Sequence, residues 1–460
     1  MKKIYKYLTF TAFAALILVS CRKEEKLNVD INDLNPDNPT TNTPLDQWLS
    51  TNFLDTYNID VVYRYNRYYH SNTANITPPK LANVQPTMQI VLDGFINPYR
   101  KIAGEVFTKK YMPKEWILFG SNAYDNVNDP GAAGTASAGR RITLYGLNDY
   151  QPMPGGQFYA WDRHRIMHHE FGHILNQIIP IPVDFEPLSK GLYKQPYRDT
   201  PADVARANGF VTSYASGSPT EDYAESVSYP LVNGQAWYDA YANGSTAEGK
   251  NRLIQKELNV INYFTALGVN YKELQREVQL YMKNTLNRQE AKFPYWLGQK
   301  LWSSMTVNLN SDVYTTYGQS SEFGTVYNAA KANVNALPGY GLTFNFIKFN
   351  FTSATAMNVE ISFNQGATAL LANYAFNMAI NQATGEIVFT TGTAGGTTAA
   401  WVGNANLLAT PVAPLLSYLT GNTFVGDWLP VSINADNYMK FGGFSVKGTP
   451  TNYFYGPLAY

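Results

Sequence analysis

The stretch HHEFGHILNQ, residues 168–177, holds three of the chain's five histidines around one glutamate. Asp162 upstream is a suitable N-cap, and Pro180 downstream lacks the backbone N–H that would continue a helix. The spacing therefore predicts a helix from about Asp162 to about Ile179. The chemistry of the chain depends on what this helix presents on one face.

Within this helix, His169, Glu170 and His173 match the pattern HExxH. Four residues along a helix advance roughly 6 Å and turn about 40° beyond a full circle, so both imidazoles project from one face and can reach one ion. Imidazole ligands with an open fourth position favour Zn²⁺. Glu170 is offset from the ligands and stands beside that open position, where a general base is needed. The pattern predicts a zinc site with a catalytic glutamate.

His164 and His168 are also four residues apart and form a rival pair, but no glutamate follows His164. We expect these two to be ordinary surface histidines, or histidines that support the site from behind. Gly172 costs about 1 kcal/mol against alanine in mid-helix, so we expect it to serve close packing or a crowded site.

A working zinc site needs a third protein ligand, and the segment 221–225, EDYAE, offers carboxylates at the start of a second predicted helix. Glu221 and Glu225 lie about one turn apart on the same face. Glu221 is the preferred ligand, with Asp222 and Glu225 as rivals. Ser218, three residues before Glu221 and followed by Pro219, also predicts a capping box, which alone would explain a glutamate here.

The pattern HExxH followed by a helix with E-x-x-A-E is similar to that of the gluzincin metallopeptidases, notably the lethal-factor type. The resemblance implies that His169, His173 and Glu221 hold zinc and that Glu225 orients one of the histidines. Such enzymes have a tyrosine seven residues before the ligand glutamate, inside a Ser-Tyr pair. Tyr214 stands at that spacing, although it is one of 34 tyrosines in the chain.

By the same resemblance, Glu170 accepts a proton from the attacking water and passes it to the leaving amine. Tyr214 donates a hydrogen bond to the oxyanion. The predicted strand at residues 140–147, RRITLYGL, resembles the edge strand along which such enzymes align an extended substrate.

The first 20 residues read as an export signal, in which the positive segment MKKIYKY precedes a short apolar stretch. The sequence LVSC at 18–21 resembles a bacterial lipobox, which implies cleavage before Cys21 and lipidation of that residue. Cys21 is the single cysteine of the chain, so no internal disulfide can form. The alternative is a signal peptide that ends at a chance cysteine. Residues 21–44 predict a flexible tether after the lipidated cysteine.

The charged residues 22–25, RKEE, resemble the surface-export tag of outer-membrane lipoproteins in bacteria with starch-utilisation-type importers. A solvated charged leader would look the same. We expect an outer-membrane lipoprotein that is exposed at the cell surface, with such an importer as a partner. The formal net charge is zero and no basic block is present, which argues against nucleic acid as a partner.

The whole of residues 1–290 resembles the zinc-binding metallopeptidase lipoproteins associated with nutrient-import loci. The segments that carry this resemblance are the lipobox, LDQWLSTNFLDTYNIDVVYRY (45–65), WDRHRIMHHEFGHILNQ (161–177) and the EDYAE helix. The resemblance implies a hydrolase, and we expect its substrate to be a peptide or protein.

The expected fold class is α+β, with a zincin-like (gluzincin) catalytic domain at 45–292 and a β-rich domain at 340–460. Residues 293–339 are expected to connect them. In the first domain, strands are predicted at 58–69, 114–121 and 140–147, with a loop of turn formers at 122–139. A helix is predicted at 86–107 with a break at Pro98. In the second, residues 342–351 alternate cleanly, and Ala383-Thr384-Gly385 marks a hairpin.

Two other functions remain open from the sequence. The chain could be a capture lipoprotein without activity that binds peptides or glycans for an importer, or a metal-dependent hydrolase of a bond other than a peptide. An intact Glu170 argues against an inactive scaffold, because a binding module has no use for a general base at that position.

Overall fold

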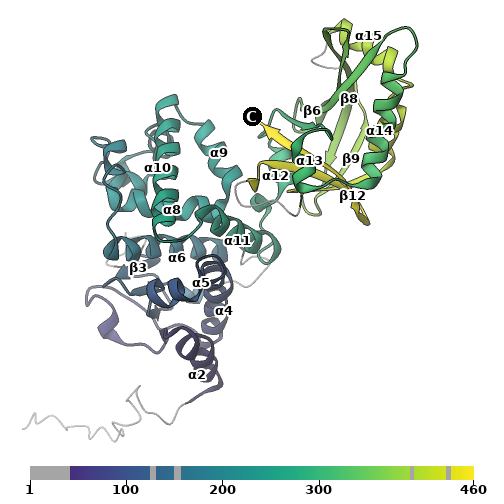
Figure 1. Ribbon diagram of the computed structural model, residues 1–460. Helices are drawn as coiled ribbons and strands as arrows, with labels where there is room; N and C mark the ends of the chain where they lie inside the picture. Colours follow the sequence, from purple (N-terminus) through teal and green to yellow (C-terminus); the bar gives the residue numbers. More distant parts are fainter. Residues whose placement is uncertain (1–41, 125–130, 150–156, 394–397, 431–436) are drawn as a thin grey trace, which may run out of the picture. The chain divides into compact units, whose positions relative to one another are not determined.

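The computed structural model describes residues 42–124, 131–149, 157–393, 398–430 and 437–460, without the side chains of 157–161 (Figure 1). Residues Leu49–Tyr460 form one compact unit. The predicted export signal, Cys21 and the tether up to residue 41 lie outside the described residues. Within the described ranges, every helix is too short or too polar to cross a membrane.

The described residues in the first two-thirds of the chain are mostly helical, with four short strands. In order, its elements are α2 (Pro44–Leu49), η2 (Ser50–Leu54), α3 (Asp55–Tyr57), β1 (Asp60–Val62), η3 (Arg67–Tyr69), α4 (Leu81–Val91), η4 (Leu92–Ile96), α5 (Asn97–Tyr111), β2 (Glu115–Leu118), β3 (Gly134–Ser137), β4 (Arg141–Leu144), η5 (Leu147–Asp149), α6 (Gln157–Ile178), η6 (Glu186–Ser189), η7 (Tyr197–Asp199), α7 (Ala202–Ala207), η8 (Tyr214–Gly217), α8 (Pro219–Asn233), α9 (Gln235–Asn243), α10 (Ala247–Ala266), α11 (Tyr271–Asn284), η9 (Gln289–Ala291) and α12 (Phe293–Gly298).

The four strands form one sheet in the order β1-β2-β4-β3, with β3 antiparallel to β4 and the other pairs parallel. The predicted strands at 114–121 and 140–147 are therefore present as β2 and β4. The expectation that 140–147 is the edge strand is wrong, because β4 lies between β2 and β3. The edge is β3, inside the segment predicted as a loop. Its residues Gly-Thr-Ala-Ser carry too little β-branched or aromatic character to be recognised as a strand.

Two other local predictions need correction. Of the strand predicted at 58–69, only Asp60–Val62 pairs, and the chain then turns into η3. Helical structure continues past Pro98, because proline fits the first turn of α5, where its missing N–H costs no hydrogen bond. The kink lies instead at Gly104, whose φ of 80° is in the region that favours glycine.

The helices α6 and α8 cross at a contact between small residues. A β-carbon added to Gly172 of α6 would lie 3.4 Å from the Cα of Ala224 in α8, and Ala224 is fully buried. The two helices lie close together at Gly172, but a β-carbon there would make only ordinary contacts, so glycine is not required for the packing. This contact brings the HExxH segment next to the EDYAE segment.

The C-terminal part is a closed barrel in the strand order β10-β11-β12-β5-β6-β7-β8-β9. Its elements are β5 (Ser304–Val307), α13 (Asp312–Tyr317), α14 (Ser321–Asn335), β6 (Leu342–Phe351), β7 (Ala356–Gln365), β8 (Thr368–Ile380), β9 (Glu386–Thr391), α15 (Ala399–Leu408), α16 (Ala413–Gly421), β10 (Thr423–Asp427), β11 (Phe441–Val446) and β12 (Thr449–Ala459). The predicted hairpin at 383–385 joins β8 to β9, and Gly385 has a φ of 74°.

The mixed α+β class with a β-rich C-terminal part is thus confirmed, and the β-rich part is a barrel. Alternate residues of its strands fill the interior with aromatic rings, such as Phe349 and Phe444 on Phe454 at centroid distances of 5.1 Å. The strand β5 lies within 293–339, the segment predicted as a connection, and pairs with β12 and β6.

Candidate metal centre and cleft

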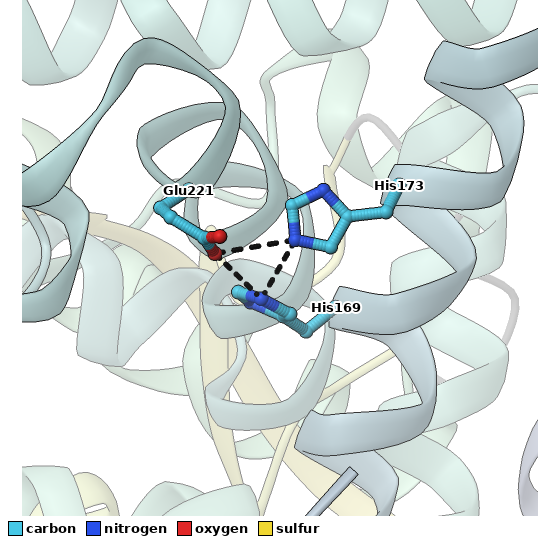
Figure 2. A group of neighbouring side chains, drawn as sticks. All are labelled: His169, His173 and Glu221. Carbon is cyan, nitrogen blue, oxygen red and sulfur yellow. Dashed lines mark hydrogen bonds and ion pairs between the residues drawn. The ribbon is translucent and has the colours of Figure 1, made fainter. Parts of the chain in front are cut away.

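Three side chains from two helices converge on one point. His169 and His173 project from α6, and Glu221 projects from the first turn of α8, as Figure 2 shows. The Glu221 Oε2 atom lies 3.1 Å from His169 Nε2 and 3.2 Å from His173 Nε2, and the two Nε2 atoms are 3.1 Å apart. Ligand atoms at about 2.0–2.1 Å from a tetrahedral ion lie roughly 3.3 Å from one another. The donor set and its spacing therefore fit a zinc ion.

Glu221 lies both at the capped start of α8 and at the candidate metal centre. The Ser218 side chain accepts a hydrogen bond from the Glu221 backbone N–H at 3.3 Å and so caps α8. The Glu221 carboxylate is directed at the two histidines instead of back at the cap. The helix start and the ligand position are therefore set by the same few residues.

The two rival carboxylates have other partners. Asp222 is fully buried and pairs with Lys256, whose Nζ lies 2.7 Å from its Oδ2. Lys256 also donates to the Gly209 carbonyl at 2.7 Å, and the Tyr193 hydroxyl donates to Asp222 at 3.0 Å. This network ties the loop before α8, α8 itself and α10 together, behind Glu221.

Glu225 lies behind His169. Its Oε1 atom is 2.9 Å from His169 Nδ1 and 3.4 Å from an Arg165 nitrogen, and its Oε2 accepts from the Thr212 hydroxyl at 2.7 Å. A carboxylate on Nδ1 holds the proton there, which leaves Nε2 with a free lone pair that points at the centre. Glu225 is thus placed to orient His169.

Glu170 is buried next to the edge strand. Burial raises the pKa of its carboxyl, although the positive charge of the nearby histidines opposes this shift. The Ala136 backbone N–H also donates a hydrogen bond to the carboxylate. A β-carbon added to Gly134 would lie 3.4 Å from Glu170 Oε1 and only 2.3 Å from the Ile166 side chain. The close approach of β3 to α6 therefore depends on glycine at 134.

The electrostatics of the centre favour a cation. Burial lowers the pKa of His169, but its hydrogen bonds with Glu221 and Glu225 outweigh burial and raise that pKa to about 10. The same contacts with His169 and His173 hold the pKa of Glu221 below its usual range, although burial acts in the other direction. The two carboxylates that stabilise a proton on His169 would also stabilise a divalent ion in its place.

Tyr214 reaches the centre from η8. Its ring lies 5.8 Å from that of His169, it hydrogen-bonds Glu221, and it is 38% exposed. Burial and the nearby Glu221 raise the pKa of its hydroxyl, so the hydroxyl keeps its proton at neutral pH. The side chain is placed where a proton donor to a substrate would be needed.

A cleft of about 590 Å³ opens beside these residues. We call it the cleft throughout; its lining residues are Ser71, Ala74, Ala123, Gly131, Ala132, Ala133, Gly134, Thr135, Tyr145, Arg165, Ile166, His169, Glu170, Tyr197, Arg198, Thr212, Tyr214, Glu225 and Tyr229. One wall is the backbone of 131–135, which leads into the edge strand β3. Other lining side chains come from η7, η8 and the part of α8 that holds Glu225 and Tyr229.

Several of these residues were missed from the sequence. Arg165 stands four residues before His169, so helical spacing alone could have placed it on the same face. Gly134 and Thr212 gave no local signal, because their positions depend on strand pairing and on contacts between distant segments. Arg198 lies in a loop-rich stretch with no pattern of its own.

The rival pair His164 and His168 is not at the surface. Both are fully buried in the core behind α6, and the Tyr99 hydroxyl lies 3.2 Å from His168 Nδ1. Burial and the nearby His164 hold the pKa of His168 well below its usual range, so it is neutral. The expectation of surface histidines is therefore wrong for both, because this face of α6 packs against the Phe95 region rather than against water.

The family model described as "Putative zinc-binding metallo-peptidase" matches residues 38–272. Among solved structures, a crystal structure of a "putative zinc-binding metallo-peptidase" from Bacteroides caccae ATCC 43185 is 27% identical, with a TM-score of 0.45. The match covers 53% of this chain and 92% of that one. No curated protein matches.

Proposed function

Because the chain belongs to the family of putative zinc-binding metallo-peptidases, we propose that it is a zinc-dependent peptidase of the gluzincin type. The observation that carries the proposal is the convergence of His169, His173 and Glu221 on one point, with Glu170 beside it. Zinc, when held there, supplies a Lewis acid that polarises a carbonyl and lowers the pKa of water. Every other part of the mechanism rests on side chains of this chain.

Glu170 is the proposed general base. Its raised pKa, caused by burial, suits a carboxylate that takes a proton from the attacking water and then delivers it to the leaving amine. The hydrogen bond from the Ala136 backbone holds its carboxylate at the edge of β3, close to where a substrate backbone would lie. Tyr214 is the proposed donor to the oxyanion, since its hydroxyl stays protonated and faces the cleft.

The edge strand β3 is the proposed guide for the substrate. The Tyr145 N–H donates to the Ala133 carbonyl at 3.0 Å. Along the antiparallel β3–β4 pair, every second residue of β3 from Ala133 onwards therefore bonds β4 through its backbone. The backbone groups of Gly134 and Ala136 therefore point away from β4, towards the open edge. Because Ala136 already donates to Glu170, Gly134 is the position left for pairing with an extended peptide.

Location and biological role are part of the proposal. We infer an outer-membrane lipoprotein, anchored through Cys21 and exposed at the cell surface, that supports nutrient import with a starch-utilisation-type importer. Support comes only from the lipobox and the charged residues after it. The alternative, a capture lipoprotein that binds peptides or glycans without cleaving them, predicts that Glu170 is dispensable.

The test uses the protein from Lys26 onwards and its Glu170→Gln, Glu221→Ala and Arg100→Gln variants. Zinc content per chain is measured first, and cleavage of internally quenched peptides second. We expect about one zinc in the parent and in Glu170→Gln, a sharp loss in Glu221→Ala, and cleavage only by the parent and the Arg100→Gln control. Equal cleavage by Glu170→Gln would rule out the mechanism, and full zinc retention in Glu221→Ala would rule out this ligand set.

A further inference from the structure

We propose that the cleft prefers peptides with a carboxylate close to the cleaved bond, and that Arg198 recognises that carboxylate. The inference rests on the proposed peptidase function and names the substrate class of the same site. It comes from the distribution of charge along the walls of the cleft.

Among the described lining residues, those of the strand-side wall are uncharged. This wall consists of the backbone and small side chains of 131–135, together with Ser71, Ala74 and Ala123. Apart from His169, the charged residues in the described part of the lining are Arg165, Glu170, Arg198 and Glu225. Within this described part, selection by charge would come from one of these four.

Three of the four are already engaged. Arg165 lies 2.9 Å from Asp162 and 3.4 Å from Glu225, so its charge is balanced inside the protein. Glu225 is held by Arg165, Thr212 and His169. Glu170 is buried and accepts the Ala136 hydrogen bond at the catalytic position.

Arg198 differs from these in that it is exposed. In the described ranges no carboxylate lies within ion-pair distance of it, and its guanidinium lies 5.2 Å from the centre of the Tyr197 ring. Stacking on a tyrosine leaves the five N–H donors of an arginine free around the rim of the plane. Two of those donors can bind both oxygens of one carboxylate in a bidentate arrangement.

Arg198 is also connected to the metal centre through a short series of rings. Tyr197 meets Tyr214 edge-on at a centroid distance of 4.9 Å, and Tyr214 lies 5.8 Å from His169. An extended peptide advances about 3.3 Å per residue, so Arg198 is reached within a few residues of the cleaved bond. The side chain of a glutamate or aspartate, or the terminal carboxylate of a short peptide, has the required charge and shape.

The expected effect is modest, because Arg198 is exposed to water. Ion pairs at exposed positions are worth up to about fivefold in binding, and two hydrogen bonds to one carboxylate raise this to about tenfold. The preference should weaken as salt is raised, since exposed charges are screened.

The test uses a series of internally quenched alanine-based peptides in which one glutamate, or one glutamine, occupies each position in turn. Values of kcat/KM are measured for the purified protein and for its Arg198→Gln, Arg198→Lys and Arg198→Glu variants, with Arg100→Gln as the control on a distant exposed arginine. Binding of the same peptides to the Glu170→Gln protein is measured by fluorescence anisotropy, with and without Arg198→Gln.

We expect glutamate to be preferred over glutamine by about three- to tenfold at one or two positions, and this preference to vanish in Arg198→Gln, shrink in Arg198→Lys and reverse in Arg198→Glu. Cleavage without any preference would overturn this inference and leave the proposed function intact. If glutamate peptides bind more tightly in a way that depends on Arg198, but the parent protein cleaves none of them, the recognition of a carboxylate would be supported. The proposed peptidase function would then be wrong. A preference that survives Arg198→Gln, or no binding of any peptide, would also overturn the inference.

Discussion

Gly172 and Ala224 face each other where α6 crosses α8, so closely that a β-carbon on Gly172 would lie 3.4 Å from the Ala224 Cα. This contact sets the distance between the two helices that carry the candidate ligands. The alanine of the E-x-x-A-E pattern thus has a packing reason of its own, separate from the two glutamates on either side of it.

Glycines 134 and 172 should respond differently to alanine. At Gly172 the added carbon makes ordinary contacts, and alanine favours a helix interior by about 1 kcal/mol, so Gly172→Ala should be neutral or stabilising. At Gly134 the carbon would meet Ile166 at 2.3 Å, so Gly134→Ala should cost about 1–3 kcal/mol and disturb Glu170. Urea unfolding of both variants measures the difference; equal stability would show that β3 moves aside freely.

The cap of α8 can be weakened without removing the ligand. Ser218→Ala should lower the free energy of unfolding by about 1 kcal/mol, because the Glu221 N–H loses its partner, whereas Ser218→Asp should retain it. Zinc content at saturating zinc should stay the same in both variants. A loss of zinc in Ser218→Ala alone would mean that the cap also holds the carboxylate in place.

The buried pair of Lys256 and Asp222 should be costly to break from one side. Lys256→Met leaves the Asp222 carboxylate buried without its cation, and we expect a loss of about 3–5 kcal/mol. Lys256→Met combined with Asp222→Leu should recover part of that loss. Lys250→Met, on the exposed side of the same helix, is the matched control and should be nearly neutral. Denaturant unfolding of the parent and these three variants measures the differences in stability.

Asp239 should make stability depend on pH. Burial raises the pKa of its carboxyl, although hydrogen bonds from Tyr460 and Gln235 oppose the shift. A raised native pKa means that the folded state binds the proton more tightly than the unfolded chain. The contribution of Asp239 to stability is therefore full below the unfolded pKa of about 3.9 and declines as the pH rises through the native value.

Comparison with Asp239→Asn isolates this effect. The difference in unfolding free energy between parent and variant should move in favour of the variant as the pH is raised from about 4 towards 7. A difference that stays constant across this range would mean that the native pKa is not raised.

Removal of metal should lower the thermal stability of the parent. A ligand that binds only the folded state stabilises it by about 4 kcal/mol at a thousand times its Kd, and chelation removes that contribution. We expect a strong chelator to lower the Tm of the parent and to leave that of Glu221→Ala unchanged. A Tm that falls equally in both would indicate a metal bound elsewhere in the chain.

The histidine pair of the candidate centre was predictable because its determinants are local: the spacing of His169 and His173 follows from helix geometry alone. Glu170 follows from the same turn. For the residues of the HExxH segment, the sequence pattern therefore predicts the folded arrangement directly. The choice of Glu221 over its neighbouring carboxylates rested instead on the resemblance to gluzincins, because its approach to the histidines depends on the packing of α6 against α8.

The walls of the cleft were less predictable. The strand β3 is built from small residues that look like a loop until pairing with β4 is known, and Arg198 lies close to the centre only through Tyr197 and Tyr214. The barrel strands from 342 onwards were visible by alternation, but closure depends on β5, which pairs with β12 about 150 residues away. Such pairings depend on the whole chain and leave no mark in a short window of sequence.

The cap of α8 has a consequence for how this site can change over evolution. Ser218 begins the helix and Glu221 is counted from it, and each residue of an α-helix turns the next side chain by about 100°. One residue inserted between them would move the carboxylate to another face of the helix, although the rest of α8 could still form. The interval from Ser218 to Glu221 is therefore fixed in length, and so is the interval back to Tyr214, whose hydroxyl bonds the same Glu221 carboxylate.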